Sequence, residues 1–458
     1  MGRALLSLLP LLPILPVLPL LAADPLSQTS FTLERAAEVV ATLHASCERC
    51  DWGVAGREAA AVTIAVDGRY RGHVMLTRGE RDAEYRVLLG RYARGRHSVA
   101  VASDPSATAS GAGAIHVSRV DIASIGENDP SFEALAHAPI LHARPNTIGK
   151  FTDVPLLMWY ETGPTPRGRS YRYSVIFSNE DGGTATDRLM ATWGRTTDIE
   201  FVYGIELDAD GRTIAEEFQG PDHVVTPFRG RREHRHPLEF VVTDNNMVSD
   251  RPPSLKLRGT GPASLKLRGT SGLGTSAVRY APAPELFDLT NQSREVVMDA
   301  HPWTYRVASA EMRREGKIAD DAAPGSGKIP DPRRFVFVEA CSELEGAALA
   351  FGVRVTGPDG PRWFDSHRER DQFRIVRTGC FRGAVPLAGS SAIPKPDAIR
   401  FRAWPQADPK TERPRVRVVR VNMIFTLDDD FVRNPIPFTW TGSLILTLDG
   451  TPAELPLY

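Results

Sequence analysis

Short stretches of alternating apolar and polar residues, separated by turn residues, constrain the fold of this chain more than any other feature. Ala61 to Val66 has strand character, and Asp67-Gly68 follows it as a strong hairpin signal. Further strand-like stretches follow at intervals of about 12 residues as far as Asp121. Repeated short strands are typical of antiparallel sandwiches. The predicted fold class is therefore mainly β, built from tandem antiparallel β-sandwich modules.

These stretches fall into three groups along the 458 residues, and a chain of this length needs more than one core. The region between the second and third groups is rich in Gly, Pro, Asp and Lys, which indicates a linker or long loop. We expect a sandwich at 30–125, a central β-rich domain at 139–301 with an inserted loop at 251–274, a linker or long loop at 302–333, and a C-terminal sandwich at 334–458.

The stretch Phe31 to Ser46 remains ambiguous. Leu33, Val40 and Leu43 fall at helical spacing with neighbouring alanines. The same residues also fit a strand that enters the turn after Ser46, so both structures stay open.

The first 23 residues predict a cleaved signal peptide. Arg3 precedes an apolar run that ends at Leu21, and small residues follow ahead of Asp24. Four prolines interrupt this run, which disfavours the alternative of a membrane-spanning helix. No later run is long and apolar enough to cross a bilayer, so we expect no transmembrane segment in the mature chain. The predicted location is secreted or periplasmic.

Four cysteines in an exported chain are expected to form disulfides, and three connectivities are possible. We favour Cys47–Cys50 and Cys341–Cys380, one bridge in each outer module. The Cys47–Cys50 spacing also fits a thiol redox motif, which requires the cysteines at the start of a helix. A four-cysteine zinc site would need both pairs to converge.

Charge composition excludes some partners. The net charge is −1, whereas a nucleic-acid-binding protein needs a basic face. The same balance argues against electrostatic docking on anionic lipid. Arginine greatly outnumbers lysine among the 55 basic residues, a bias that indicates GC-rich coding DNA and hence a bacterial source.

The candidate site in the central domain is an acidic strand face. Asp198 and Glu200 are two residues apart, so on a strand they point to the same side. Paired carboxylates repel unless a cation or a shared proton relieves them. Hard oxygen ligands suit Ca²⁺ or Mg²⁺, and His223 and His236 are candidates to complete such a metal site. The alternative is a polar outer strand face with Arg195 as the counter-ion.

Aromatic residues in the outer modules suggest a second kind of site. Tyr70, Tyr85, Trp363 and Phe373 could form a face on which a glycan stacks. Half-buried strands are rich in aromatic residues for packing reasons alone, so the alternative is an ordinary sandwich interior.

The acidic stretch also resembles a known motif. Gly194, Asp198 and Glu200 match the heptapeptide of the secreted necrosis-inducing cytolysin family, and residues 139–250 are similar to the related vacuolar protein-sorting β-sandwich family. The heptapeptide's two His and one Trp positions hold Arg195, Thr197 and Ile199 here. The resemblance implies a central β-sandwich in which Asp198 and Glu200 bind a divalent cation beside a glycolipid-headgroup site.

Two classes of function follow. The first is an exported, non-enzymatic protein that binds a surface glycan, a lipid headgroup or a protein. The second is a secreted hydrolase that uses the acidic and His residues of the central domain, with or without a divalent metal. We favour binding, because a fold class does not imply an activity.

Overall fold

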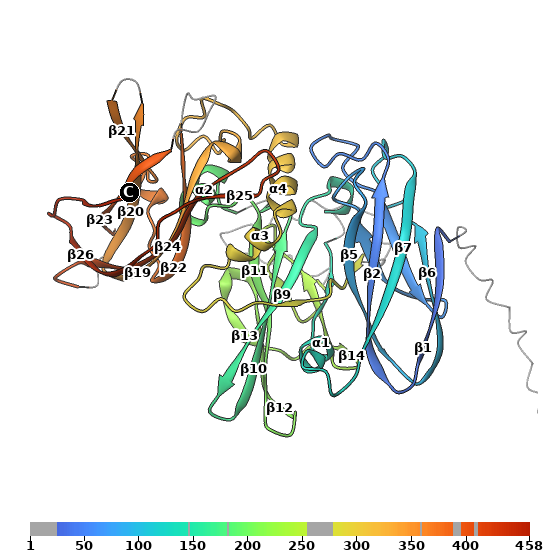
Figure 1. Ribbon diagram of the computed structural model, residues 1–458. Coiled ribbons are helices and arrows are strands. Elements are labelled where there is room, and N and C mark those ends of the chain that lie inside the picture. The colour runs from blue at the N-terminus through green and yellow to red at the C-terminus, as the bar shows by residue number, and fades with distance from the viewer. Residues whose placement is uncertain are drawn as a thin grey trace, which may run out of the picture.

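The computed structural model describes residues 25–144, 147–180, 183–253, 278–357, 360–387, 395–406 and 411–458. The predicted signal peptide and most of the predicted insertion at 251–274 lie outside these ranges. Three lobes follow one another along the chain, with the N-terminal lobe on the right of Figure 1 and the C-terminal lobe on the left. The predicted fold class is confirmed: the protein is mainly β, with several separate and largely antiparallel sheets.

The N-terminal lobe is a sandwich of two sheets around one apolar core. Its first sheet has the order β1 (Ser27–Leu33), β6 (Gly95–Ser103), β3 (Ala61–Val66) and β4 (Arg69–Met75). Its second sheet has the order β5 (Ala83–Tyr92), β2 (Ala37–Cys47) and β7 (Ile115–Ile125).

The ambiguous stretch after residue 30 forms strands. Phe31 lies on β1, and the residues from Ala37 onward form β2, the middle strand of its sheet. Buried and half-buried side chains alternate from Ala41 to Cys47, which is the period of a strand. Pairing with β5 on one side and β7 on the other outweighs the helical spacing of the leucines and valines.

The central lobe also contains two sheets. The larger has the order β13 (Val225–Pro227), β12 (Thr213–Gln219), β11 (Asp198–Leu207), β10 (Gly168–Phe177), β9 (Pro155–Thr165) and β18 (Glu285–Leu286). The smaller has the order β14 (Arg232–Glu233), β15 (His236–Val241), β8 (Ile140–His142) and β17 (Arg279–Tyr280), and β16 (Val248–Ser249) pairs with β15. The β15–β8 and β18–β9 pairs are parallel.

The C-terminal lobe is a second sandwich around its own core. One sheet has the order β22 (Gly379–Pro386), β19 (Phe335–Glu345), β24 (Arg415–Leu427) and β25 (Arg433–Ile436), and β26 (Trp440–Thr447) also pairs with β24. The other has the order β21 (Gly360–Asp365), β20 (Ala347–Gly357), β23 (Pro396–Pro405) and β27 (Ala453–Pro456).

Short helices lie between the lobes, and one of them corrects the predicted linker. The helices are α1 (Phe132–Ala136), α2 (Thr186–Trp193), α3 (Val296–Ala300) and α4 (Trp303–Arg314). Most of the first half of 302–333 is therefore helical. Thr304, Val307, Ala308 and Glu311 are buried at helical spacing, a signal that the Gly- and Pro-rich residues further along obscured.

Helix α4 contacts all three lobes. Towards the N-terminal sandwich, the Trp52 indole donates a hydrogen bond to Glu311 Oε2 at 2.9 Å. Towards the C-terminal sandwich, the Tyr305 ring lies 6.2 Å from the Phe337 ring, centroid to centroid. Within the central lobe, Thr186 of α2 donates to the Met312 sulfur at 3.7 Å. One helix thus holds the three lobes in a fixed arrangement.

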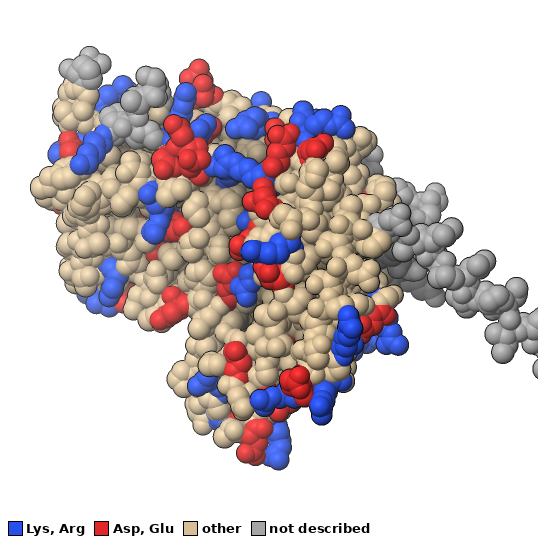
Figure 2. All heavy atoms as spheres, turned by 45° about the vertical axis from the view of Figure 1, so that its right-hand side comes forward, with Lys and Arg blue, Asp and Glu red and all other residues tan. Residues whose placement is uncertain are grey.

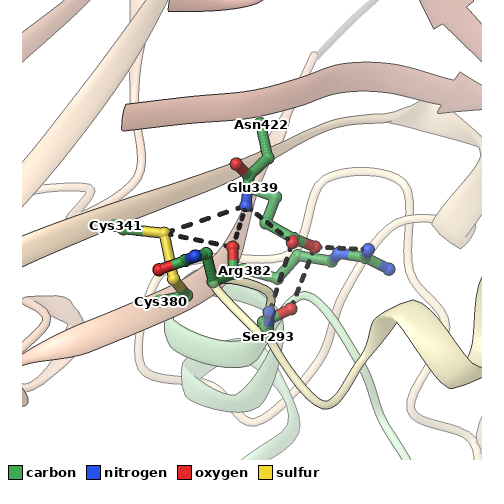
Figure 3. Close-up of a disulfide and its surroundings, with 7 residues drawn as sticks. Ser293, Glu339, Cys341, Cys380, Arg382 and Asn422 are labelled. Carbon is green, nitrogen blue, oxygen red and sulfur yellow. Dashed lines mark hydrogen bonds and ion pairs between the residues drawn. A yellow bond between two sulfur atoms is a disulfide. The ribbon is translucent and has the colours of Figure 1, made fainter. Parts of the chain in front are cut away.

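A buried arginine fastens the C-terminal sandwich to this helical layer. Arg382 of β22 is 0% exposed and makes a bidentate ion pair with Asp299 of α3, at 2.7 and 2.6 Å. It also donates to Tyr305 at 2.8 Å and to Glu339 at 2.6 Å. Ser293 donates to the same Glu339 carboxylate at 3.0 Å, as Figure 3 shows. The network joins residues from β19 and β22 to residues from α3 and α4.

The end of α2 requires glycine for two reasons. Gly194 caps α2 with φ +60°, a conformation that side chains other than glycine rarely adopt. A Cβ atom there would also lie 2.8 Å from Cγ of Arg382. Gly194 therefore lets the arginine stem pass directly over the helix end.

Two disulfides are present, with the favoured connectivity. Cys341 and Cys380 face each other on the paired strands β19 and β22, beside Glu339 and Arg382 (Figure 3). Cys47 and Cys50 close a local turn at the end of β2 rather than starting a helix.

Arg382→Met should destabilise the protein by about 3–5 kcal/mol, because Asp299 and Glu339 would remain buried without their counter-ion. Guanidinium chloride unfolding measures this loss. The control is Arg417→Met on β24, whose ion pair with Glu343 at 2.5 Å is about half exposed, and which should cost less than about 1 kcal/mol. Equal losses in the two variants would contradict a role for the buried network.

Removing the Cys341–Cys380 bridge should cost about 4 kcal/mol, because it closes a loop between residues 39 apart in sequence. Removing Cys47–Cys50, which are 3 apart, should cost about half as much by the same loop-entropy argument. Denaturant titrations of the two double serine variants test this order, and the reverse order would count against it.

Candidate functional site

The predicted acidic pair lies at the start of β11. Asp198 is the first residue of the strand and is 2% exposed, and Glu200 is 7% exposed. Side chains from other segments cover both carboxyl groups, with Asn246 against Asp198 and Gln219 against Glu200. The alternative of a polar outer strand face is therefore wrong for these two residues.

Amide side chains from other segments hold the two carboxyl groups. Asn246 Nδ2 donates to Asp198 Oδ2 at 2.9 Å, and Gln219 Nε2 donates to Glu200 Oε2 at 2.5 Å. Arg195 Nη1 lies 4.0 Å from Asp198 Oδ1, while its Nε is 3.2 Å from Glu295. Arg195 is thus shared between two acidic residues.

Burial sets the charge of the pair. It raises the pKa of Glu200, and the neighbouring charge of Asp198 raises it further. Burial also raises the pKa of Asp198, against the opposing effect of Arg195. Both pKa values are raised, so the pair retains a proton to higher pH than two separate carboxyl groups would.

The two histidines predicted to join this pair lie in different places. His223 is exposed, and its Nδ1 is 3.3 Å from the amide nitrogen of Gln219, one residue removed from Glu200. His236 is buried against the N-terminal sandwich, where Nε2 is 3.2 Å from Glu38 and Nδ1 is 3.0 Å from the Ala138 carbonyl. The described residues contain no group of three or more His, Cys, Asp or Glu side chains placed to hold a metal ion.

The predicted aromatic residues do not share one face. Tyr70 and Tyr85 belong to the N-terminal sandwich, and Phe373 of the C-terminal lobe is 1% exposed. Trp363 lies on β21, where the Arg400 guanidinium stacks at 4.4 Å from its ring centroid. Tyr85 instead lines a cavity between the N-terminal sandwich and the central lobe.

A cavity of about 310 Å³ lies where the N-terminal sandwich meets the central lobe. Strands β4 and β5 form one wall, and the start of β9, the segment 280–285 and Trp303 of α4 form the other. Backbone hydrogen bonds join the walls, from Leu88 to the Ala281 carbonyl at 2.8 Å and from Ala283 to the Arg86 carbonyl at 3.1 Å. The lining residues Glu84 and Arg86 are exposed, so the cavity reaches the surface there.

Stacked side chains form the most distinctive part of the lining. The Arg78 guanidinium lies 3.8 Å from the ring centroid of Trp303 and 5.2 Å from that of Tyr85. The backbone amide of Arg78 donates to the Tyr85 hydroxyl at 3.1 Å. Burial raises the pKa of Tyr85 to about 12 and lowers the pKa of Arg78. The phenol is therefore neutral, and the Arg78 side chain is partly buried beside it.

Most of the charged groups of the lining are already paired, whereas the buried hydroxyl of Tyr280 has no hydrogen-bond partner among the described residues. Glu285 is 3.1 Å from Arg86 and 3.1 Å from His301, and the hydrogen bond from His301 lowers the pKa of Glu285. His73 is 2.8 Å from Asp104. His73 and His301 are 228 positions apart in the sequence. No local sequence motif therefore predicts the cavity.

No family model matches this chain, and no curated protein matches its sequence. The resemblance of the acidic stretch to the cytolysin and sorting families therefore stays a prediction. Among the described residues, no helix is both long and apolar enough to cross a membrane.

Glu200→Gln should flatten the dependence of stability on pH. The folded state holds the Glu200 proton more tightly than the unfolded chain, so the free energy of unfolding falls as pH rises from about 5. Each unit of pKa difference is worth about 1.4 kcal/mol. Melting temperatures across this range should decline less in the variant than in the native protein.

The matched control is Glu217→Gln on the neighbouring strand β12, whose side chain is 45% exposed. This variant should keep the native pH profile. Parallel profiles for the native protein and Glu200→Gln would show that Glu200 is not the proton-holding group.

Proposed function

We propose that this protein is an exported, non-enzymatic binding protein, and that it takes a surface glycan into the cavity between the N-terminal sandwich and the central lobe. The observation that supports this most directly is the stack of Trp303, Arg78 and Tyr85 in that cavity.

The size and lining of the cavity suit a small organic ligand. A volume of about 310 Å³ lies at the lower end of the roughly 300–1,000 Å³ of small-molecule sites. Such sites combine apolar and aromatic walls with a few polar groups that fix orientation. Here Val74, Met75 and Leu157 supply apolar surface, and Trp303 and Tyr85 offer rings. A sugar ring has an apolar C–H face that packs on such rings and hydroxyls that meet the polar groups.

Export is supported by the leader residues and by the two disulfides, which persist in oxidising compartments. Basic and acidic side chains are interspersed on the face drawn in Figure 2. That pattern suits a protein that recognises a ligand in a defined site better than one that adheres through a large charged surface.

The hydrolase alternative draws less support. Asp198 and Glu200 are covered, whereas general acid–base groups must come within hydrogen-bond reach of a substrate. The void beside the adjacent Arg195 and Thr196 is about 10 Å³, room for no more than one water molecule.

Trp303→Ala should abolish glycan binding, because it removes one ring of the stack. The measurement is affinity electrophoresis in native gels that contain polygalacturonate, dextran or chitosan, with retardation by at least one polymer expected for the native protein. Trp363→Ala, a comparable change in the C-terminal sandwich, should leave retardation intact. If no polymer retards the native protein, or both variants lose retardation equally, the cavity is not a glycan site.

A further inference from the structure

We propose that Arg78 is an oxyanion-binding residue, and that the glycan taken by the cavity carries a carboxylate, as a uronic acid does. This inference rests on the proposed glycan-binding function and adds the chemical class of the ligand.

The Arg78 guanidinium has a cation's charge without an acidic partner. Among the described residues, none makes an ion pair with it, and its Nε is buried without a hydrogen-bond partner. Glu84 and Glu285 also line the cavity, but Glu285 is occupied by Arg86 and His301. Glu84 is exposed, and His44 lies 3.8 Å from it. The cavity therefore contains a positive charge whose hydrogen-bond donors are unused.

Stacking gives this charge a defined orientation. The guanidinium carbon of Arg78 lies over the Trp303 ring, 3.8 Å from its centroid, and a guanidinium that stacks on a ring keeps its N–H donors free for a ligand at the ring edge. These donors match the two oxygens of a carboxylate. Arg78 is only partly buried, and of its side-chain nitrogens only Nε is buried without a partner, so a ligand carboxylate would take the place of water at the two outer nitrogens.

The rest of the lining favours an anion attached to a ring over a free anion. Apolar and aromatic side chains make up most of the walls, and the second lining guanidinium, Arg86, is already paired with Glu285, so an inorganic ion would find only Arg78. A sugar acid would contact both the aromatic wall and the guanidinium, with its ring on Trp303 and its carboxylate on Arg78.

Galacturonate and galactose test this inference, since they differ only in the carboxylate at C6. Isothermal titration of the full chain should show galacturonate binding roughly ten- to hundred-fold more tightly than galactose, the factor expected from a charge-assisted hydrogen bond. The preference should shrink as NaCl is raised. Inorganic phosphate alone should bind weakly, because it has no ring to stack.

Arg78→Met should remove the preference and leave the two sugars equal. The control is Arg119→Met, an exposed arginine on β7 paired with Asp121 at 2.8 Å, which should keep the preference. Residual galactose binding and an unchanged melting temperature show that Arg78→Met is folded. If that variant unfolds, Arg78→Lys replaces it and should retain only part of the preference, because a point charge lacks the paired donors.

The two proposals fail in different ways. Equal affinity of the native protein for galacturonate and galactose would overturn the carboxylate inference while leaving glycan binding in place. No heat or affinity for either sugar, together with no retardation by any polymer, would overturn both. Phosphate binding as tight as galacturonate would also overturn the inference, since the ring would then contribute nothing.

Discussion

The buried ion-pair network of Arg382 is the interaction on which the arrangement of the lobes depends. Arg382 contributes no solvent-exposed surface, and it satisfies Asp299, Glu339 and Tyr305 at once. Charges removed from water in this way are tolerated only when each one is paired. Since Tyr305 lies on α4, the network also fixes the helix whose first residue, Trp303, forms a wall of the cavity.

Buried charge is stabilised in three different ways in this protein, and the comparison supports the proposed site. In the Arg382 network both terminal nitrogens of the guanidinium have acidic partners, and only Nε lacks one. The Asp198–Glu200 pair relieves its repulsion by keeping a proton, and it is covered by Asn246 and Gln219. Arg78 has neither solution: aromatic rings pack on it, and Glu84 and Glu285 act on it from a distance, but no described residue makes a direct ion pair with it. This incomplete arrangement beside a cavity is the basis of the proposed ligand site.

Local patterns predicted the strands and both disulfides, because alternation and turn residues act over a few positions. They also placed Asp198 and Glu200 on one strand face correctly. Distant segments decided the rest. Phe31–Ser46, which the local spacing left open, forms strands through pairing with β6, β5 and β7, and packing against three lobes made Trp303–Arg314 a helix where a linker or long loop was predicted. His236 faces Glu38 of another lobe, which its distance from Asp198 in sequence could not reveal.

The sequence by itself determined a mainly β chain with paired cysteines and an acidic strand face, because these features follow from residue order within single elements. The tertiary structure alone decided which faces are covered and which residues meet. In the folded protein the acidic pair is buried, and His236, expected beside that pair, lies at the interface between two lobes instead. Arg78, Tyr85 and Trp303 meet at one cavity. The reason is physical: a cavity between lobes is made by side chains far apart along the chain, and only packing brings them into contact.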